Sequence, residues 1–472
     1  MKAKAMDDRR SPHDWRPEIR KGASPLFLVI ADALAADIQS GALAAGDRLP
    51  SQRSLADVLE IDFTTVSRAY AEARRRGLIE GRVGQGTYVR TGRVGIEAGA
   101  PATAGVVDMA MNLPPKFEDA ELEARLWTSI REVEGSGGLD LLLRYQEAGG
   151  AVDDRAAGVV WLSSRIPALA PDRLLICPGA QGALLSLLTL LGKPGQAIAV
   201  EQLSYPGFRS LAAHLSTPLV PVTMDGEGLL AEAFEAVCKR EAPKLLYCTP
   251  TLHNPTTATM TLERRQSVIA VARKYGVLII EDDAYGKLSG DTPPPLAALA
   301  PDIVYHVAGL SKCLSPALRL AYVVVPDVRA AAHLAGAIRA TTAMASPLSA
   351  AIATNWIESG LAGEALAAIR AETEVRRAAA TELLGSYGLT TARHAFHAWL
   401  PLADDWTRGE LAARLRAAGI GVVTSDAFAV GQPPEAVRIG LGAAPTRDHL
   451  KGSLGLIADL TGQPPAMSSM VV

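Results

Sequence analysis

Three kinds of chemically useful group follow apolar runs in this sequence: a turn that contains glycine, an aspartate and a lysine. At the ends of such runs, side chains can contact a small ligand. A turn at 178–181, Pro-Gly-Ala-Gln, follows one run and opens a helical pattern, so its backbone amides can hold a phosphate. Asp282 follows a second run, with Tyr285 three residues on. Lys312 follows a third, with Arg319 seven residues on. Each signal is weak alone, because a lone lysine or an Asp-x-x-Tyr pair is structural or solvated far more often than catalytic.

The segments that must position these residues alternate between strand and helix. Short apolar runs predict buried strands, and helical patterns such as 181–191 and 263–275 separate most of them. This alternation predicts a largely parallel sheet with helices on both faces, followed from about residue 370 by a smaller α+β lobe. The predicted strands are Leu174–Ile176, Ala197–Val200, Leu245–Cys248, Val277–Ile280, Ile303–Val307 and Leu320–Val325.

The polar groups are more specific as an ordered set than singly. From about residue 110 to 460 their order and rough spacing resemble the fold type I aminotransferases that use pyridoxal phosphate. The resemblance implies an α/β transferase-like domain and pyridoxal 5'-phosphate as its cofactor. The matching residues are Gly179-Ala180-Gln181, Tyr205-Pro206-Gly207, Asn254-Pro255-Thr256, Asp282, Tyr285, Ser311-Lys312, Arg319 and Arg438.

The same resemblance implies a role for each matching residue. Lys312 would form a Schiff base with the cofactor aldehyde, and Asp282 would keep the pyridine nitrogen protonated. Arg438 would grip the carboxylate of an amino acid, and Tyr145 resembles a tyrosine donated across a dimer interface. Lys312, Asp282 and Tyr205, which would stack on the ring, are the expected catalytic residues. The remaining cofactor contacts would come from Asn254 and Tyr285 at the ring hydroxyl, and from Ala180, Gln181, Ser311 and Arg319 at the phosphate.

Four positions depart from the pattern of these aminotransferases. Gly309 stands where many members have a phosphate-binding Ser or Thr, and Thr257 replaces a usual glycine. Alanine also replaces glycine twice within 316–321. We expect these changes to reshape the phosphate pocket or weaken turnover, and cofactor binding to survive them.

The first ninety residues predict three helices and a glycine-tipped hairpin. Ser24-Pro25 can begin the first helix and Gly41 can end it. Ser51 can cap a second helix that turns Leu55, Val58 and Leu59 inward, and Asp62 can cap a third that buries Val66, Ala69, Tyr70 and Ala73. Two short strands, 78–80 and 87–89, then flank a glycine-rich turn. This is the order of a winged helix-turn-helix.

The chemistry of this N-terminal segment suits double-stranded DNA. The open face of the third helix carries Thr64, Thr65, Ser67 and Arg68, which fit base edges and phosphates in the major groove. Arg53, in the first turn of the second helix, can reach a phosphate. By spacing alone, a three-helix bundle with merely solvated charges is the alternative.

Three runs, 38–56, 65–70 and 76–87, favour DNA binding over that alternative because they closely resemble the GntR family of bacterial regulators. The resemblance covers residues 24–90, and it implies that Arg53, Arg68 and the wing residue Gly86 contact the operator.

Composition and charge agree with a multidomain DNA-binding protein. The 472 residues suggest about three folding units. Residues 1–93 carry 16 Lys and Arg against 12 Asp and Glu, a net charge of +4, whereas the remainder carries −7, so a polyanion suits the N-terminal part. No apolar run approaches a membrane span, the four cysteines lack CxxC spacing, and no histidine pair has metal-ligand spacing. These features predict a cytoplasmic protein without a metal site.

We therefore expect a disordered leader at 1–23, a winged helix at 24–90, a flexible linker at 91–106 and an aminotransferase-like domain at 107–465, with its large lobe ending near 369. This combination resembles the MocR subfamily of GntR regulators. The resemblance implies a homodimer that binds DNA and senses an amino compound or a vitamin-B6 signal through an aldimine at Lys312. Two alternatives stay open. The chain could be a working class I/II aminotransferase with an accessory DNA-binding domain, or its large domain could only dimerise.

Overall fold

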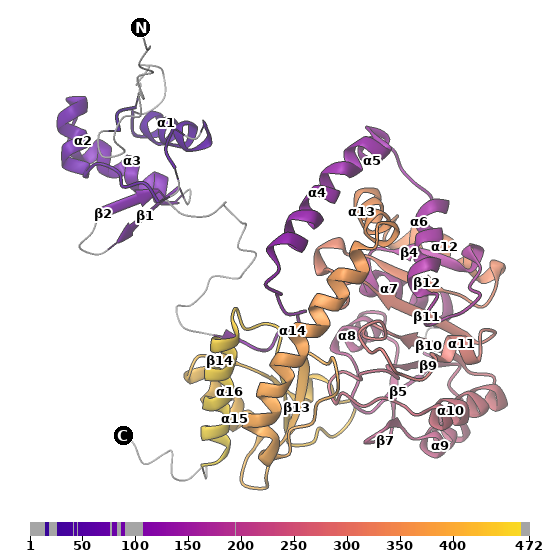
Figure 1. Cartoon of the computed structure of the whole chain (residues 1–472). Coiled ribbons are helices and arrows are strands. Elements are labelled where there is room, and N and C mark those ends of the chain that lie inside the picture. The colour runs from indigo at the N-terminus through magenta and orange to yellow at the C-terminus, as the bar shows by residue number, and fades with distance from the viewer. Residues whose placement is uncertain are drawn as a thin grey trace. The chain divides into compact units, whose positions relative to one another are not determined.

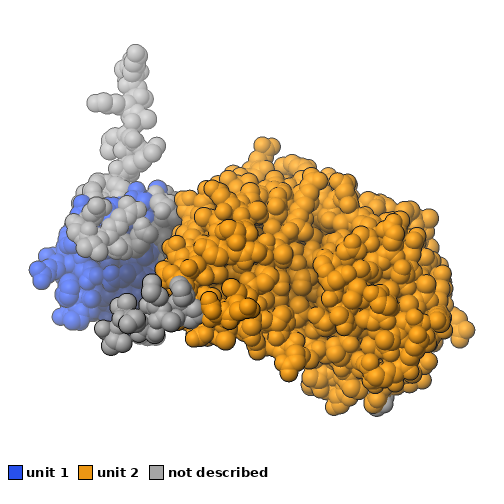
Figure 2. Space-filling model, turned by 90° about the horizontal axis from the view of Figure 1, so that it is seen from below, with its two compact units in different colours: residues 1–102 blue, residues 103–472 orange. Residues whose placement is uncertain are grey.

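The computed structural model describes residues 15–17, 26–40, 42–44, 46–75, 78–82, 86–89, 107–193 and 195–463. The chain forms two compact units, residues 1–102 and residues 103–472, which Figure 2 colours separately. The predicted linker at 91–106 lies outside the described residues. Each unit has its own hydrophobic core, and we describe each by itself.

Unit 1 is a three-helix domain with a two-stranded wing (Figure 1). Its elements are α1 (Leu26–Ser40), α2 (Gln52–Leu59), α3 (Phe63–Arg75), β1 (Ile79–Arg82) and β2 (Gly86–Val89), and the two strands pair antiparallel. Ser51 caps α2 by accepting the Ser54 amide, and Asp62 accepts the Thr64 amide at the start of α3. The predicted stripe of α3 is buried, with Tyr70 donating its hydroxyl to the Pro50 carbonyl at 2.8 Å. The predicted winged helix is confirmed.

Two details of unit 1 differ from expectation. Val58 is 38% exposed, and Ala56 packs inward instead, because the inward arc of this eight-residue helix runs through Leu55 and Ala56. Trp15 falls in the predicted disordered leader, yet it is buried in the unit 1 core and donates its indole N–H to Asp37 at 2.8 Å. Residues 1–14 and 18–25 lie outside the described part of the chain.

Unit 2 is built on a seven-stranded sheet with the order β4-β12-β11-β10-β9-β5-β6. All neighbours pair parallel except that β12 is antiparallel to both β11 and β4, which confirms the largely parallel sheet. The strands are β4 (Leu174–Cys177), β5 (Ile198–Glu201), β6 (Leu219–Val222), β9 (Leu245–Cys248), β10 (Leu278–Asp282), β11 (Val304–Gly309) and β12 (Ala321–Val324).

Helices cover both faces of this sheet because its strands are apolar on both sides. One core lies under α7 (Gly179–Leu191), α8 (Pro206–His214) and α12 (Val328–Thr341). The other lies under α6 (Val152–Leu162), α9 (Ala231–Glu241), α10 (Leu262–Tyr275), α11 (Leu296–Leu299) and α13 (Pro347–Glu358). Two further helices, α4 (Ala120–Gly137) and α5 (Asp140–Leu143), lead into α6, and β7 (Met224–Asp225) pairs with β8 (Gly228–Leu229).

A smaller α+β lobe follows the large sheet, as predicted. Its three-stranded sheet has the order β13-β16-β15, formed by β13 (His397–Pro401), β16 (Ala436–Gly440) and β15 (Val423–Thr424). The helices α15 (Arg408–Ala417) and α16 (Arg447–Thr461) share its core with the long α14 (Leu361–Leu384), which runs from one lobe to the other (Figure 1). The predicted lobe boundary near 370 therefore falls inside α14 and does not mark a break in the chain.

The first described segment of unit 2 belongs structurally to the small lobe. Strand β3 (Val107–Asp108) pairs parallel with β14 (Ile420–Gly421), more than 300 residues away in sequence. Among the described residues, no helix is both long and apolar enough to cross a membrane.

Candidate functional site

The carboxyl ends of the parallel strands gather the predicted site residues at one edge of the large sheet. Asp282 ends β10, Lys312 follows β11, and Asn254 follows β9. Tyr205 follows β5, and the turn at 178–181 follows β4, which runs parallel to β11 because β12 is antiparallel to both. Ligands of open α/β sheets bind at this edge.

Asp282 has one oxygen engaged and one free to take a partner. The Tyr247 hydroxyl donates to Asp282 Oδ2 at 2.8 Å, whereas Asp282 Oδ1 is buried and has no hydrogen-bond partner in the described part of the chain. Burial raises the pKa of Asp282 to about 6, against the lowering effect of the Tyr247 hydrogen bond. A buried carboxylate of this kind fits a cationic N–H donor such as a protonated pyridine nitrogen.

Lys312 is set up to be neutral more often than an ordinary lysine. Burial, with repulsion from Arg438 and Arg319, lowers the pKa of Lys312 to about 8. Its Nζ donates to the backbone carbonyl of Asn112. A lysine amine activated in this way is a nucleophile toward an aldehyde.

The predicted phosphate subsite lies where α7 begins. Gly179 has a φ of +73°, which directs the first amides of the helix outward. The Arg319 guanidinium lies 3.5 Å from the place that a Cβ on Gly179 would take, so a cation faces these amides. The side-chain amide of Gln181 is engaged elsewhere, because its Nε2 donates to the Gly207 carbonyl at 3.0 Å. The backbone N–H of Gln181 lies in the first turn of α7. Ser311 is half-buried beside Lys312.

Two departures noted in the sequence have simple structural consequences here. A Cβ on Gly309 would lie 3.4 Å from the Ala180 side chain, an ordinary contact, so the glycine leaves space beside the phosphate subsite. Thr257 has a φ of +63°, a left-handed conformation that glycine adopts without steric cost. Its amide donates to the His253 carbonyl at 2.6 Å, which holds the turn in place.

Arg438 is a buried cation at the junction of the two lobes of unit 2. It lies in β16, donates to Asn254 Oδ1 at 3.0 Å and to the Ala110 carbonyl, and has its Nε without a partner among the described residues. Its guanidinium carbon lies 5.2 Å from the centre of the Phe428 ring. Because no carboxylate is paired with it in the described structure, the pocket has an unneutralised positive charge that favours an anion.

Tyr285 and Tyr205 complete the lining of this site. Asn112 Nδ2 donates to the Tyr285 hydroxyl at 2.8 Å, and the Tyr285 ring meets the His397 ring at a centre distance of 5.3 Å. Tyr205 is half-buried at the start of α8, and its pKa is raised by burial and by the nearby charge of Asp282. The charged groups predicted for this site lie close together, because Asp282, Arg319 and Arg438 all act electrostatically on both Lys312 and Tyr205.

Sequence reasoning missed Tyr247, Asn112, His397 and the Ala110 carbonyl. Tyr247 stood inside an apolar strand run and was interpreted as core, which it also is, since its ring stacks on Phe208 at 3.7 Å. Burial lowers the pKa of His397 to about 3, so it is a neutral imidazole between Asn112 and the His253 carbonyl. Asn112 carries no motif; its only signal is an amide in an otherwise apolar stretch.

Tyr145 does not reach this pocket within its own chain. It follows α5 and is 91% exposed, beside other large apolar side chains that face solvent. These are Trp127 at 56% exposure, Leu139 at 68%, Leu142 at 65% and Leu143 at 69%. Its contact across a dimer interface stays a prediction.

The predicted DNA contacts lie on two neighbouring parts of unit 1. Arg53 and Gly86 line one hollow of about 260 Å³ between the start of α2 and the wing. On α3, Thr64 and Arg68 are exposed, and Thr65 and Ser67 are half-buried. Thr64 Oγ1 donates to its own cap Asp62, and the Arg68 guanidinium stacks 4.2 Å from the centre of the Phe27 ring. These residues stay predicted contacts.

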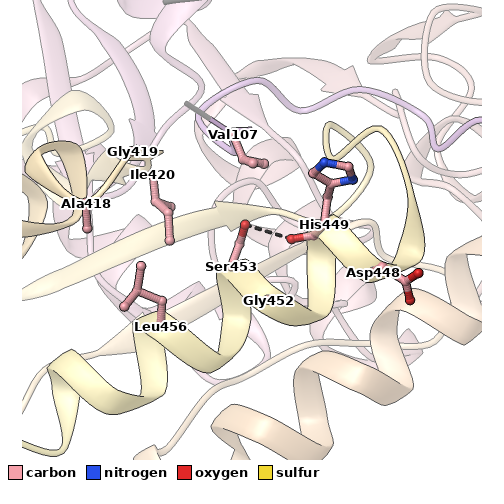
Figure 3. A pocket seen from close by; sticks show the side chains of 9 residues that line it. All are labelled: Val107, Ala418, Gly419, Ile420, Asp448, His449, Gly452, Ser453 and Leu456. Carbon is pink, nitrogen blue, oxygen red and sulfur yellow. Dashed lines mark hydrogen bonds between the residues drawn. The ribbon is translucent and has the colours of Figure 1, made fainter. Parts of the chain in front are cut away.

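Unit 2 has a hollow of about 420 Å³ in its small lobe, which none of the predicted site residues lines (Figure 3). It is bordered by Val107 of β3, Ile420 of β14 and the α16 residues His449, Ser453 and Leu456, with the Ser453 hydroxyl turned back onto the His449 carbonyl at 2.8 Å. The described residues contain no group of histidine, cysteine and acidic side chains suited to a metal ion.

Comparison with known proteins matches both units. Residues 129–454 match the family of aminotransferases of class I and II, and residues 27–89 match the gntR family of bacterial regulatory proteins. The HTH-type transcriptional regulator YdeF of Bacillus subtilis is 31% identical over 458 residues, which cover 95% of this chain and 97% of YdeF. The probable rhizopine catabolism regulatory protein MocR of Rhizobium meliloti is 25% identical, over 64% of this chain and 66% of its own.

Solved structures extend the likeness to the fold of unit 2. The α-aminoadipate aminotransferase LysN of Thermus thermophilus, solved with N-(5'-phosphopyridoxyl)-L-leucine, superposes with a TM-score of 0.69 at 22% identity. The match covers 78% of this chain and 94% of LysN. The fold of unit 2 is therefore that of a fold type I aminotransferase.

Proposed function

Because this chain belongs to the MocR subfamily of gntR-family transcription regulators, with an aminotransferase class I and II domain, we propose that it is a regulator whose DNA binding responds to an amino compound captured at Lys312. The cofactor of this response is pyridoxal 5'-phosphate. The observation that carries the proposal is the convergence of Lys312, Asp282 and Arg438 on one pocket of a chain that also has a DNA-binding unit.

The residues of the pocket fit the cofactor. When bound, pyridoxal phosphate supplies an aldehyde that condenses with primary amines, and its ring accepts electrons. Lys312 would hold the aldehyde end, and the free Asp282 Oδ1 would accept from the pyridine nitrogen. The α7 amides with Arg319 would bind the phosphate, while Tyr205 would cover the ring.

The charge of the pocket selects the class of effector. A primary amine would be required of the effector, because the cofactor would supply an aldehyde beside Lys312. Arg438, buried and with its Nε unpaired among the described residues, favours a carboxylate or a similar anion on the same molecule. The effector is then an amino acid or an amino compound with an anionic group.

The assembly that carries this response is a homodimer. The exposed apolar side chains of α4 and α5 form its interface, because five large apolar groups at 56% exposure or more are costly to leave in water. Tyr145 of one protomer then contributes to the pocket of its partner. A symmetric dimer also presents two unit 1 copies to two half-sites on DNA.

One observation supports a second function. Lys312, Asp282 and Arg438 are all present, Asp282 and Arg438 buried and Lys312 half-buried, so the residues that transamination would need are in the described site. An active aminotransferase with an accessory DNA-binding domain is therefore the alternative.

Reconstitution tests these functions. Full-length protein mixed with pyridoxal phosphate should develop visible absorbance that Lys312→Ala abolishes, and absorbance unchanged in that variant contradicts the lysine assignment. A spectral shift or a single half-reaction with an amino donor supports the sensor. Sustained turnover with a keto acid supports the enzyme, and an absence of any cofactor binding would leave the large unit as a dimerisation domain.

A further inference from the structure

The first described segment of unit 2 runs past the residues predicted to bind the cofactor and the effector. We call residues Val107–Leu113 the strap. It is the first described part of unit 2, and only residues 90–106 separate it along the chain from the wing strand β2.

The strap is pinned by the residues that recognise ligand. The Ala110 carbonyl accepts from Arg438, the carboxylate anchor of the proposed effector site, and the Asn112 carbonyl accepts from Lys312. The Asn112 side chain donates to the Tyr285 hydroxyl at 2.8 Å. Three of the predicted ligand-binding residues therefore hold the strap in this structure.

The small lobe provides a close-fitting track for the strap. The Gly440 amide donates to the Met109 carbonyl at 2.7 Å, and the Val107 amide donates to the Gly419 carbonyl at 2.7 Å. A Cβ on Gly442 would stand 1.9 Å from the Leu113 carbonyl oxygen, and a Cβ on Gly440 would stand 2.5 Å from that of Met111. Backbone atoms cannot yield as a flexible side chain can, so the strap has one seated position on this track.

The strap and a bound carboxylate compete for the same donors. An amino-acid carboxylate gripped by Arg438 accepts two N–H groups in a charge-assisted fork, which a neutral carbonyl such as that of Ala110 cannot match. Arg438 Nη1 already donates to Asn254, and the unpaired Nε–H can form a fork only together with Nη2, which is the nitrogen that donates to the Ala110 carbonyl. Capture of the carboxylate therefore loosens the strap at its centre.

We propose that the strap is the element through which occupancy of the pocket is reported to the DNA-binding unit: the effector carboxylate displaces the Ala110 carbonyl from Arg438, the strap leaves its track, and the attachment point of the N-terminal unit at Val107 changes. This inference rests on the proposed function, because it needs the cofactor pocket to hold an amino compound. Val107 pairs with Ile420 at the rim of the small-lobe hollow, so the far end of the strap is held by a short two-residue strand alone (Figure 3).

The test compares two probes that differ only in the carboxylate. Full-length apoprotein is loaded with N-(5'-phosphopyridoxyl)-L-alanine or with N-(5'-phosphopyridoxyl)ethylamine, and amide hydrogen exchange of the strap is followed by mass spectrometry. Both probes fill the cofactor pocket. With the alanine probe we expect strap amides to exchange about ten-fold faster or more than with the ethylamine probe, as for a locally released segment. Equal exchange with both probes overturns the inference, whereas failure of both probes to bind overturns the proposed function on which it rests.

A glycine variant tests whether strap release reaches DNA. Gly442→Ala should displace the strap without ligand, because its Cβ meets backbone. The strap amides of this variant should exchange fast with either probe. The variant should also bind the DNA duplex upstream of the protein's own coding sequence with the affinity of the alanine-loaded wild type. Gly455→Ala, in α16 with nothing within 4 Å of its Cβ, is the matched control and should behave as wild type. If the strap of Gly442→Ala exchanges fast but the variant binds DNA with the affinity of the ethylamine-loaded wild type, release of the strap does not change DNA binding and the inference is contradicted. If Gly442→Ala does not fold, the comparison of the two probes on the wild type still decides whether the strap responds.

Discussion

At the scale of single residues, the pocket combines charged groups that water would normally stabilise. Asp282, Lys312 and Arg438 are each withdrawn from solvent, and burial is the first cause of the pKa shift at all three. The shifts have opposite chemical uses. The lowered pKa of Lys312 makes more of it a neutral nucleophile at a given pH, whereas the raised pKa of Asp282 makes it easier to protonate than an exposed carboxyl group, an effect that a cationic partner would oppose.

The pKa of Lys312 predicts the pH dependence of cofactor capture. Only the neutral amine attacks an aldehyde, and the neutral fraction rises as pH increases through about 8. At pH 7 this fraction is roughly 300-fold larger than for a lysine of ordinary pKa. The rate at which apoprotein captures pyridoxal phosphate should therefore rise with a midpoint near pH 8, followed by stopped-flow absorbance.

Arg438→Gln should move that midpoint upward, because it removes one of the two positive charges that lower the Lys312 pKa. Arg125→Gln, which removes an exposed arginine paired with Glu364, serves as the control and should leave the midpoint in place. A capture rate that keeps rising to pH 10 in the wild type contradicts the shifted pKa.

The hydroxyl of Tyr247 predicts a positioning role for a residue that lies in the core. Tyr247→Phe keeps the ring stacked on Phe208 but removes the donor to Asp282 Oδ2. Loss of one hydrogen bond to a buried carboxylate costs about 1.5 kcal/mol, so cofactor affinity should fall by about ten-fold.

Spectral titration with pyridoxal phosphate measures this loss, and the pH dependence of the bound cofactor's absorbance should shift as well, since the Asp282 pKa loses a lowering interaction. Tyr275→Phe, which removes a surface hydroxyl bonded to Glu235, is the matched control. Equal affinity in Tyr247→Phe and wild type would show that the hydroxyl only packs.

At the scale of elements, the periodicity of apolar residues was sufficient to predict the strands and helices of the large sheet, and with them the sheet edge at which the site residues meet. The runs at 245–248 and 303–307 form β9 and β11. A strand that is apolar on both faces is buried on both faces only inside a sheet that helices cover on each side. Contacts made through backbone atoms were not predictable. The Ala110 and Asn112 carbonyls meet Arg438 and Lys312, and every residue type has a carbonyl. Trp15 was missed because residues 1–23 carry no pattern that would place its side chain against Asp37 of α1.

The start of α2 predicts how the winged helix uses charge. Arg53 is exposed beside the wing glycine Gly86, where a DNA phosphate can approach the first amides of the helix. Arg53→Ala should weaken binding about equally for different DNA sequences and lower the slope of log affinity against log salt by about 1. Fluorescence anisotropy over a range of salt concentrations measures both. Arg329→Ala, which removes an exposed arginine of α12, should leave the slope unchanged. A sequence-dependent loss would instead assign Arg53 to base recognition.

At the scale of the whole molecule, function requires parts that the chain places far apart in sequence. The strap at 107–113 meets Arg438 and Gly440 of the small lobe and Lys312 of the large one, so the pocket is assembled only when both lobes of unit 2 are folded. Tyr145, by contrast, faces solvent at 91% exposure and has no route to its own pocket in the described fold. Tyr145 is therefore available for the contact across the proposed dimer interface.

The exposed side chains of α5 predict that assembly. Leu143 is 69% exposed beside Leu139 and Leu142. A lysine at this position would lose its hydration in a buried interface, at a large cost in free energy, whereas on a free surface the substitution would change stability little. Leu143→Lys should therefore shift the protein from dimer to monomer in sedimentation velocity while leaving thermal unfolding of an isolated protomer nearly unchanged. Val328→Lys places the same charge on a lone apolar residue of α12 that is 55% exposed, and it should remain a dimer. Because two half-sites are bound only by linked copies, Leu143→Lys should also lose affinity for a two-site duplex while retaining its weak affinity for a single half-site. A dimer that persists in Leu143→Lys would place the interface elsewhere and would leave Tyr145 without a partner pocket to reach.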